Sequence, residues 1–499
     1  MQETLSEKAF DTEVHIDEVM QQSLASFQGY KKLTQYQRAD FLETIAAEIE
    51  KLREQLVDVA HQETNLPIGR LNGEITRTTS QLTMFADLIK EGSWVEACID
   101  TADISRTPPK PDIRRMLMPV GPVIVFGASN FPFAFSTAGG DTASALASGS
   151  SVVIKGHSAH AKTSELVFTA IQKAIEISGV PPYTVQHVLG KGNTVGKALV
   201  MHPGTKGVGF TGSFAGGKAL VDYANQREIP VPVFAEMSSI NPVVFYPDTL
   251  TKNAAQLAAQ FAGSITLGAG QFCTNPGLLL GLKSETFDQF LTQLGEEISK
   301  VLPQKMLHSG ICASFNKGLT EMLEQQGLQV MAQSAKEAED MEAPALLASV
   351  SASDFLSNKN FVEEIFGPFS LAVICEDKAQ LIACLQSLKG QLTTSIIATE
   401  KDVEEYADVI DIQQSLAGRV LLNNAPTGVE VCAAMVHGGP FPATTDARFT
   451  SVGTGAIKRW VRPVALQNFS DTMLPDGLKD DNPLNILRLL NNVYTRDKV

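Results

Sequence analysis

The sequence predicts an α/β fold in which helices cover parallel sheets. Short Val- and Ile-rich runs of strand length, such as Val123-Ile124-Val125-Phe126, alternate with longer amphipathic stretches of helical period. The short runs lack the polar alternation of half-exposed strands, which is typical of strands buried on both faces. Alternation of this kind indicates right-handed βαβ units around a parallel sheet.

Length and charge limit the function classes. A chain of 499 residues is expected to hold roughly two to four lobes. Its formal net charge of −15 repels nucleic acid and anionic membranes, so neither is an expected partner. No signal peptide or membrane span is recognised. The six cysteines are sparse and form no close metal-like pair, so we expect a cytoplasmic protein with free thiols and no metal.

The expected elements follow in order along the chain. Residues 15–92 are mostly helical. The first α/β series has strands at 123–126, 151–155, 184–189, 207–210 and 231–235, with helices at 138–147, 164–177, 194–201 and 215–226. A second series begins near residue 253, with strands at 277–282, 370–375, 394–398 and 418–423. The tail is expected to add an edge strand, 464–469, and an amphipathic helix, 484–493, as subunit contacts.

One cysteine stands among small and polar neighbours, in Gly270-Gln271-Phe272-Cys273-Thr274-Asn275. A nucleophilic cysteine needs room for a substrate carbonyl and donors for the oxyanion that its attack creates. Free cysteine is also a common small core residue. The stretch by itself therefore leaves both interpretations open.

A Gly-rich turn favours a dinucleotide site. Thr211-Gly212-Ser213-Phe214-Ala215-Gly216-Gly217 follows an expected strand and opens an expected helix, whose N-terminal N–H groups suit a pyrophosphate. It lacks the G-x-G-x-x-G spacing, so a helix start without a ligand is the alternative. Lys155 ends another strand at the carboxyl edge, where open α/β sheets bind ligands. His157 and His160 lack a third metal ligand at suitable spacing and are expected to be polar loop residues.

Three further polar residues follow apolar runs or precede turns. Asn130 comes after a small turn, so its amide either stabilises that turn or donates to an oxyanion. Glu236 ends an apolar strand, where burial raises a carboxyl pKa toward that of a general base, although a surface glutamate fits the same pattern. Glu364, in Glu363-Glu364-Ile365-Phe366-Gly367-Pro368, indicates by itself only a solvated loop.

Taken together, these features resemble the aldehyde dehydrogenase superfamily. The resemblance is carried by their order and local context: Asn130, the Gly-rich helix start, Glu236, Cys273 and Glu364. It extends from the N-terminal helices to about residue 470 and implies a Rossmann-type dinucleotide-binding lobe, an α/β catalytic lobe and a small bridging or oligomerisation element. The expected boundaries are 1–103 and 120–235 for the first, 236–445 for the second, and 104–119 and 446–499 for the third. A homodimer or homotetramer is also implied.

The resemblance implies a role for each matching residue. Cys273 would add its thiolate to the aldehyde carbon, and the Asn130 amide would hold the resulting oxyanion. Loss of hydride from this adduct would leave a thioester on Cys273, and Glu236 would activate the water that hydrolyses this thioester. The implied cofactor-binding positions are Lys155, Ser158, Gly212, Ser213, Gly217, Glu364 and Phe366.

One departure from the family concerns the cofactor. Three residues after Lys155, where NAD-preferring members often carry a glutamate, this chain has Ser158. An acidic side chain would repel a 2′-phosphate, whereas serine donates to it. We therefore expect NADP as the preferred cofactor and NAD as the alternative, with His157, Lys191 or Lys197 as phosphate partners.

Three blocks, 128–132, 236–242 and 437–448, resemble one subgroup of the family. That subgroup contains 2,5-dioxovalerate (α-ketoglutaric semialdehyde) dehydrogenases, which implies oxidation of 2,5-dioxopentanoate to 2-oxoglutarate. It also contains a long-chain aldehyde dehydrogenase, so a fatty aldehyde is the alternative substrate. A CoA-acylating enzyme is less favoured, because it needs no water-activating glutamate. Arg448 and Arg419 are candidates, by residue type, for binding a substrate carboxylate.

Overall fold

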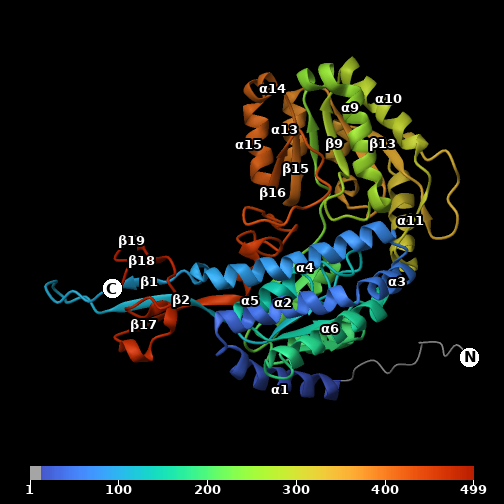
Figure 1. Ribbon diagram of the computed structural model, residues 1–499. Coiled ribbons are helices and arrows are strands. Elements are labelled where there is room, and N and C mark those ends of the chain that lie inside the picture. Colours follow the sequence, from blue (N-terminus) through green and yellow to red (C-terminus); the bar gives the residue numbers. More distant parts are fainter. Residues whose placement is uncertain (1–12) are drawn as a thin grey trace, which may run out of the picture.

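The computed structural model describes residues 13–499, and Figure 1 shows two α/β lobes and an extended arm. Within these residues the strands form two large, mainly parallel sheets of five and seven strands, a five-stranded sheet in the arm, and a two-stranded sheet of β10 (Gln304–Lys305) and β12 (Glu342–Ala343). The α/β class expected from the alternating runs is confirmed. No helix in the described range is both long and apolar enough to cross a bilayer.

The first lobe contains a parallel sheet with the order β5-β4-β3-β6-β7. Its strands are β3 (Val123–Phe126), β4 (Val152–Lys155), β5 (Val185–Val188), β6 (Gly207–Thr211) and β7 (Val233–Glu236). The order reverses at β3, so a crevice is expected beside the carboxyl ends of β3 and its neighbours. All five strands lie within two residues of their predicted bounds.

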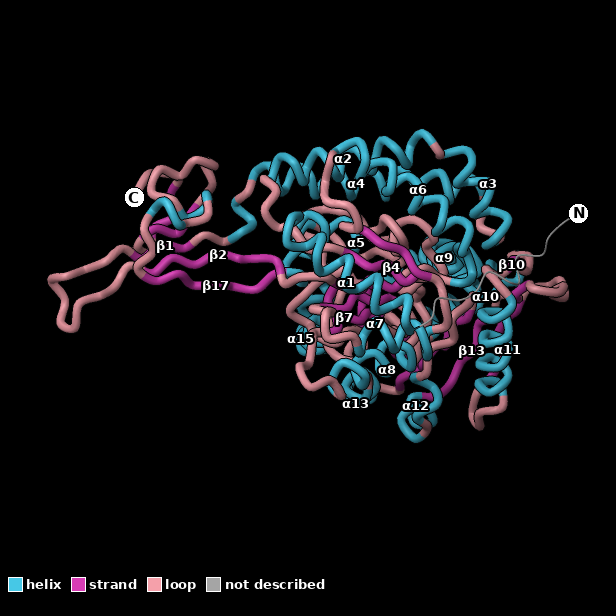
Figure 2. The backbone as a smooth tube through the Cα atoms, turned by 90° about the horizontal axis from the view of Figure 1, so that it is seen from below, coloured by secondary structure: helices cyan, strands magenta, loops and turns pink. Residues whose placement is uncertain are grey.

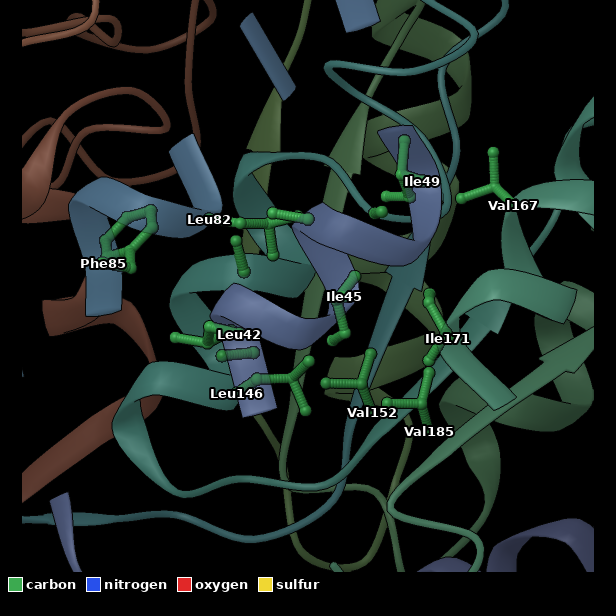
Figure 3. Packing of buried hydrophobic residues seen from close by; sticks show 14 of the residues in the cluster. Leu42, Ile45, Ile49, Leu82, Phe85, Leu146, Val152, Val167, Ile171 and Val185 are labelled. Atoms are coloured by element: carbon green, nitrogen blue, oxygen red, sulfur yellow. The ribbon is translucent and has the colours of Figure 1, made fainter. Parts of the chain in front are cut away.

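Helices cover both faces of this sheet. One face packs against α2 (Gln35–Lys51), α4 (Ile68–Glu91), α5 (Gly140–Ser148) and α6 (Ala161–Ser178), and α3 (Arg53–Thr64) joins them. The other face packs against α1 (Glu13–Tyr30), α7 (Lys197–Met201) and α8 (Phe214–Asn225). Val152 and Val185 point into the first cluster (Figure 3), whereas Val153 belongs to the second. Successive residues of each strand are thus buried on opposite faces, which explains the unbroken apolar runs.

The second lobe contains the sheet β11-β13-β14-β9-β8-β15-β16, parallel except for β11. Its strands are β8 (Val243–Phe245), β9 (Leu278–Leu282), β11 (Gln329–Gln333), β13 (Leu346–Ser351), β14 (Phe369–Cys375), β15 (Gln391–Ile397) and β16 (Ala417–Leu422). On one face lie α9 (Pro247–Thr266) and α10 (Glu285–Lys300); on the other lie α11 (Ser309–Leu323), α12 (Ala352–Ser357), α13 (Lys378–Ser387) and α15 (Ala407–Leu416). β9, β14, β15 and β16 were predicted, whereas β8, β11 and β13 were not.

The arm projects from the body of the molecule (Figure 2). Its sheet has the order β17-β2-β1-β18-β19, formed by β1 (Cys98–Asp100), β2 (Ile113–Pro119), β17 (Val461–Gln467), β18 (Arg488–Leu490) and β19 (Val493–Thr495). β17 is an edge strand close to the predicted position. The predicted tail helix is wrong, because 484–493 contains a strand and a tight turn. The lobe boundaries stay a prediction.

Candidate active site

Cys273 lies in a loop between the two lobes that begins with an unusual backbone. Gly268, Ala269 and Gly270 all have left-handed φ values, of 56°, 56° and 64°. A Cβ on Gly270 would stand 2.3 Å from the carbonyl carbon of Gly367, so only glycine fits there. Gly270 therefore lets the cysteine loop lie in close contact with the segment that carries Glu364.

Two asparagines fix the cysteine loop. Asn241, itself at φ 48°, donates through Nδ2 to the carbonyls of Cys273 and Asn275, both at 2.9 Å. Asn275 donates through Nδ2 to the Gly367 carbonyl at 3.1 Å. These buried side-chain amides donate hydrogen bonds to backbone carbonyls in and beside the loop. The position of Cys273 is therefore fixed by hydrogen bonds at Cys273 itself and at Asn275.

The Cys273 sulfur belongs to a cluster of three side chains. His437 Nε2 lies 3.4 Å from Cys273 Sγ and 2.9 Å from Glu236 Oε1. Ser451 Oγ donates to the other carboxylate oxygen of Glu236 at 2.7 Å. The His437 and Glu236 side chains are almost wholly buried, at 0% and 3% exposed. The imidazole thus bridges the thiol and the carboxylate in a dry environment.

Backbone pairing brings this histidine to the end of β7. The Met237 amide donates to Ala443, and the Thr445 amide donates to Ala235. The segment that contains both His437 and Ser451 is thereby held against Glu236. The Ser451 amide in turn donates to the His437 carbonyl at 2.9 Å.

Burial and neighbouring charges set the protonation of the cluster. Burial raises the pKa of the Cys273 thiol well above its ordinary value, and the carboxylates of Glu236 and Glu364 raise it further, against the opposing charge of Arg419. Burial is the largest single effect on Glu236 and acts to raise its pKa, but the contacts with His437, Ser451 and Cys273 together outweigh it, so the pKa lies below the usual value. The expected upward shift for Glu236 is therefore wrong. A protonated thiol beside an ionised carboxylate is the resting state that these shifts favour.

Asn130 approaches the same loop from the first lobe. It is 8% exposed and donates through Nδ2 to the Gln271 carbonyl at 3.2 Å. Its own backbone carbonyl accepts from Arg70 Nη2 at 2.7 Å. Because an amide nitrogen carries two N–H groups, this bond orients the amide and leaves a second donor for another acceptor.

The residues expected to bind the cofactor divide between the two lobes. Those at the carboxyl edge of the first sheet are Lys155, Ser158, Gly212, Ser213 and Gly217. Lys155 is 8% exposed at the end of β4, and burial lowers its pKa. Ser158 is exposed in the turn after β4. Ser213 caps α8, because its Oγ accepts from the Gly216 amide at 3.2 Å.

Glu364 and Phe366 lie in the second lobe. Both line a pocket together with Phe272, Asn275 and Ser239. Burial raises the pKa of Glu364 to about 7, although the Ser238 hydroxyl and the Ser239 amide oppose the shift. The interpretation of residues 363–368 as a merely solvated loop is wrong for Glu364, which is half-buried.

These residues fit a dinucleotide. A buried lysine, a capped helix N-terminus and a half-buried carboxylate are the donor and acceptor types that ribose hydroxyls and a pyrophosphate need. They stand at the ends of β4 and β6, on either side of the central strand β3, and across from Glu364. The structure therefore brings the catalytic candidates together at Cys273 and places five of the cofactor candidates at the carboxyl edge of the first sheet and two in the second lobe.

The two arginines suggested for substrate binding differ in their surroundings. The Arg448 side chain is 82% exposed and forms an ion pair with Asp446 at 2.6 Å. Arg419 is half-buried in β16 and acts electrostatically on the Cys273 thiol. Of these two arginines, only Arg419 lies near the cluster of Cys273, His437 and Glu236.

The sequence analysis missed His437, Ser451 and Glu74 as residues of the site. The first two lie in and just after the block 437–448, which was noted only as a subgroup feature. Glu74, on α4, accepts at Oε1 from the Phe133 and Ala134 amides at 2.8 and 3.0 Å, in the loop that carries Asn130. The sequence did contain a signal for Glu74, because a glutamate on the apolar face of an amphipathic helix needs a buried hydrogen-bond partner.

Two α/β lobes that meet at a cysteine, one of them with a dinucleotide-type sheet edge, define the class as an NAD(P)-dependent oxidoreductase. The chain belongs to the aldehyde dehydrogenase family, whose sequence profile matches residues 1–440. The resemblance drawn from the sequence motifs is thereby confirmed, and with it the expectation of an enzyme that oxidises aldehydes.

Two relatives match nearly the whole chain. Alpha-ketoglutaric semialdehyde dehydrogenase of Acinetobacter baylyi is 48% identical over 487 residues, which cover 97% of this chain and 92% of the relative. Alpha-ketoglutaric semialdehyde dehydrogenase 2 of Azospirillum brasilense is 46% identical over 465 residues, or 93% and 89% of the two chains.

Solved structures share the fold at low identity. Betaine aldehyde dehydrogenase of Staphylococcus aureus in complex with NAD+ aligns with a TM-score of 0.78 at 18% identity, over 93% of this chain and 89% of that chain. Proline utilization A of Bdellovibrio bacteriovorus aligns with a TM-score of 0.78 at 19% identity over 92% of this chain, which spans 46% of that longer protein.

Proposed function

We propose that this protein oxidises the aldehyde group of 2,5-dioxopentanoate to give 2-oxoglutarate, through a covalent intermediate on Cys273. The observation that carries the chemistry is the contact of Cys273 Sγ with His437 Nε2, which in turn contacts Glu236. The substrate is supported by the names of the two relatives that share 48% and 46% identity across nearly the whole chain.

The first step needs the Cys273 thiolate. The thiol proton passes to the His437–Glu236 pair, and the sulfur adds to the aldehyde carbon to form a thiohemiacetal. The Asn130 amide and the Cys273 backbone N–H then hold the oxyanion. Bound NAD(P)+ supplies the acceptor for the hydride that leaves this carbon. Lys155, Ser213 and Glu364 are the residues that would hold the dinucleotide.

The second step releases the acid. The proton that came from the thiol first leaves the His437–Glu236 pair for solvent. Glu236, ionised again and buried, then takes a proton from water, whose oxygen attacks the thioester carbon. The carbon–sulfur bond breaks and the proton returns to the Cys273 sulfur. His437 contacts both the sulfur and the carboxylate, so the imidazole transfers the proton between them without a new group entering the site. The sum is aldehyde, NAD(P)+ and water giving carboxylate, NAD(P)H and protons.

Steady-state kinetics with two aldehydes, in the presence and absence of CoA, test this function. The kcat/KM for 2,5-dioxopentanoate is expected to exceed that for decanal, and the product is expected to be the free acid even when CoA is present. A preference for decanal would favour a long-chain aldehyde dehydrogenase, and acyl-CoA as the main product would favour an acylating enzyme. Cys273→Ala is expected to abolish oxidation while it retains dinucleotide binding.

We also propose that NADP is preferred over NAD. Ser158 is exposed beside the buried Lys155 and offers a hydroxyl where a glutamate would repel a phosphate. His157 caps the same turn, because its Nδ1 accepts from the Ala159 amide at 3.1 Å, so the neutral ring carries its hydrogen on Nε2. Burial lowers the pKa of His157 to about 3, so its contribution to phosphate binding is a neutral N–H donor. Lys191 and Lys197 are the two lysines considered as partners of the 2′-phosphate. Of these, Lys197 lies over the Tyr223 ring.

A single substitution tests the cofactor proposal. Ser158→Glu places a carboxylate where the 2′-phosphate is expected, so the ratio of kcat/KM with NADP to kcat/KM with NAD should fall by about tenfold or more. Ser158→Ala, which adds no charge, should change the ratio much less. An unchanged ratio in Ser158→Glu would show that the 2′-position of the ribose lies elsewhere.

Two further proposals concern the whole protein. We propose a homodimer or homotetramer, because β16 and β17 stand at open sheet edges. We propose the cytoplasm as its location, because the six cysteines, all in the described part of the chain, are free.

A further inference from the structure

Three arginines lie near Cys273 or its loop. Arg70 and Arg77 come from α4 and are spaced seven residues apart, so they lie on one face of that helix. Arg419 comes from β16 of the other lobe. Arg77 and Arg419 both act electrostatically on the Cys273 thiol.

Aromatic rings hold the first two guanidinium groups beside the cysteine loop. Arg70 lies 4.7 Å from the ring centroid of Phe272 and 5.0 Å from that of Phe131. Arg77 lies 5.7 Å from the ring centroid of Phe135. The three rings contact one another through Phe131, at 5.3 and 5.6 Å, and form an apolar wall next to Cys273.

The cations are only partly satisfied. Arg77 donates from Nη1 to the Val429 carbonyl at 2.5 Å. Arg419 donates from Nη1 to the Gly428 carbonyl at 2.8 Å and from Nη2 to the Pro426 carbonyl at 2.5 Å. Buried guanidinium atoms without a hydrogen-bond partner in the described residues are Arg70 Nη1, Arg77 Nε and Nη2, and Arg419 Nε. None of the three arginines forms an ion pair within residues 13–499.

The nearest acidic groups do not fill this gap. Glu74 and Glu430 act on Arg77 from a distance. Glu74 Oε1 is already used by the Phe133 and Ala134 amides, and its Oε2, although buried without a hydrogen-bond partner, forms no ion pair with Arg70 or Arg77 in the described residues. Burial lowers the pKa of Arg77 and of Arg419, and the opposing negative groups, Glu74 and Cys273 for Arg77 and Cys273 for Arg419, offset this desolvation only in part. Buried cationic N–H groups without acceptors are costly and are normally matched by an anion.

We propose that Arg77 and Arg419 form the receptor for a carboxylate at the far end of the substrate, and so select short aldehydes that end in a carboxylate. This inference rests on the proposed function. In 2,5-dioxopentanoate the carboxylate lies four carbon–carbon bonds from the aldehyde carbon, and the chain between them suits the wall of Phe131, Phe135 and Phe272. Arg77 is the principal contact, because it offers two unpartnered nitrogens. Arg70 is a positioning residue, since its Nη2 holds the Asn130 carbonyl at 2.7 Å.

A fatty aldehyde fits this approach poorly. Its hydrocarbon chain would displace water from the guanidinium N–H groups and give them no acceptor in exchange. A carboxylate accepts two parallel N–H bonds from a guanidinium, which is the geometry that Arg77 has open. The arginines therefore act as a specificity filter as well as an anchor.

The first test compares two aldehydes of equal length. In Arg77→Met and Arg419→Met, the ratio of kcat/KM for 2,5-dioxopentanoate to kcat/KM for pentanal should fall by about 10- to 100-fold, mainly through KM for the charged substrate. Arg448→Met, which alters an exposed arginine paired with Asp446, should leave the ratio unchanged. An equal loss for both aldehydes would mean a structural role and would overturn the proposal.

The second test needs no variant, so it does not depend on folding of a mutant. Glutarate should protect Cys273 of the wild-type protein from alkylation by iodoacetamide, and dimethyl glutarate should not. Equal protection by acid and ester, or none by either, would contradict a carboxylate receptor.

The two proposals can fail separately. If the wild-type protein prefers pentanal or decanal to 2,5-dioxopentanoate, the proposed function fails at the substrate. If it prefers 2,5-dioxopentanoate while both arginine variants keep the wild-type ratio, the function stands and the receptor assignment fails.

Discussion

At the scale of single residues, the resting protonation of Cys273 depends on its neighbours. Burial and the Glu236 carboxylate both raise the pKa of the thiol. Because only the thiolate reacts, the alkylation rate of the free protein should rise with pH up to that raised pKa. The cysteine is therefore kept unreactive until its proton can move to the His437–Glu236 pair.

Glu236→Gln is expected to separate these effects. Removal of the negative charge should lower the Cys273 pKa by about one unit or more, so alkylation by iodoacetamide at neutral pH should become about tenfold faster. Aldehyde oxidation should nevertheless be lost, because no base remains to activate water. The measurement is the alkylation rate between pH 6 and 10.

A matched variant controls for general loosening of the site. Glu364→Gln should shift the Cys273 pKa in the same direction but less, because Glu364 has a smaller influence on the thiol. If Glu236→Gln is alkylated no faster than the wild-type protein, the carboxylate is not the charge that holds the thiol protonated.

Part of this site could be predicted from sequence and part could not. Asn130, Glu236 and Cys273 stand at the ends of strands or in Gly-rich turns, where local context is informative. His437 reaches Cys273 only through pairing of residues 443–445 with the end of β7. A contact between residues 164 positions apart leaves no local signal.

At the scale of elements, helix α4 positions the loop that carries Asn130. Arg70 binds the Asn130 carbonyl, and four residues further along the same helix face Glu74 accepts from the Phe133 and Ala134 amides. One helix thus holds the loop at two points. The oxyanion donor depends on α4 although no α4 residue needs to touch the reacting atoms.

Glu74→Ala should therefore lower both stability and kcat. Two buried N–H groups would lose their acceptor, at a cost of about 1–3 kcal/mol each in the free energy of unfolding. Glu74→Gln keeps one acceptor oxygen and should fall between the wild-type protein and the alanine variant. Thermal unfolding and steady-state kinetics measure the two effects, and the dissociation constant of the dinucleotide should not change.

Thr78→Ala on the same helix is the matched control. Thr78 is buried, and its hydroxyl donates only within the helix, to the Glu74 carbonyl at 2.8 Å. It should reduce stability while leaving kcat near the wild-type value. A Glu74→Ala protein that loses stability but keeps full kcat would show that α4 does not position Asn130.

Elements differ in how well local pattern determines them. Strands buried on both faces, such as β3 and β4, give continuous Val and Ile runs and were predicted closely. β8 has only three residues and depends on its neighbours β9 and β15. In the tail, Asn491 and Asn492 both have left-handed φ values, of 46° and 68°, and form the two-residue turn between β18 and β19. The apolar spacing of 484–493 favoured a helix, whereas the Asn-Asn pair was the better guide.

At the scale of the whole molecule, β16 and β17 each stand at the edge of a sheet. β16 ends the seven-stranded sheet, and its Val420 and Leu422 side chains are 38% and 61% exposed. β17 ends the sheet of the arm, which projects from the body (Figure 2). An exposed apolar edge strand pairs readily with another chain unless something covers it. We propose a second copy of this chain as the partner of these edges.

Leu422→Glu tests that arrangement, because it places a charge on the exposed apolar face of the β16 edge. Size-exclusion chromatography with light scattering should show a homodimer or homotetramer for the wild-type protein and smaller species for the variant. Val330→Glu is the control, since Val330 is 51% exposed in β11 at the opposite edge of the same sheet and should not change the assembly. A monomeric wild-type protein, or a Leu422→Glu variant of unchanged mass, would mean that the open edge of β16 is not a subunit contact.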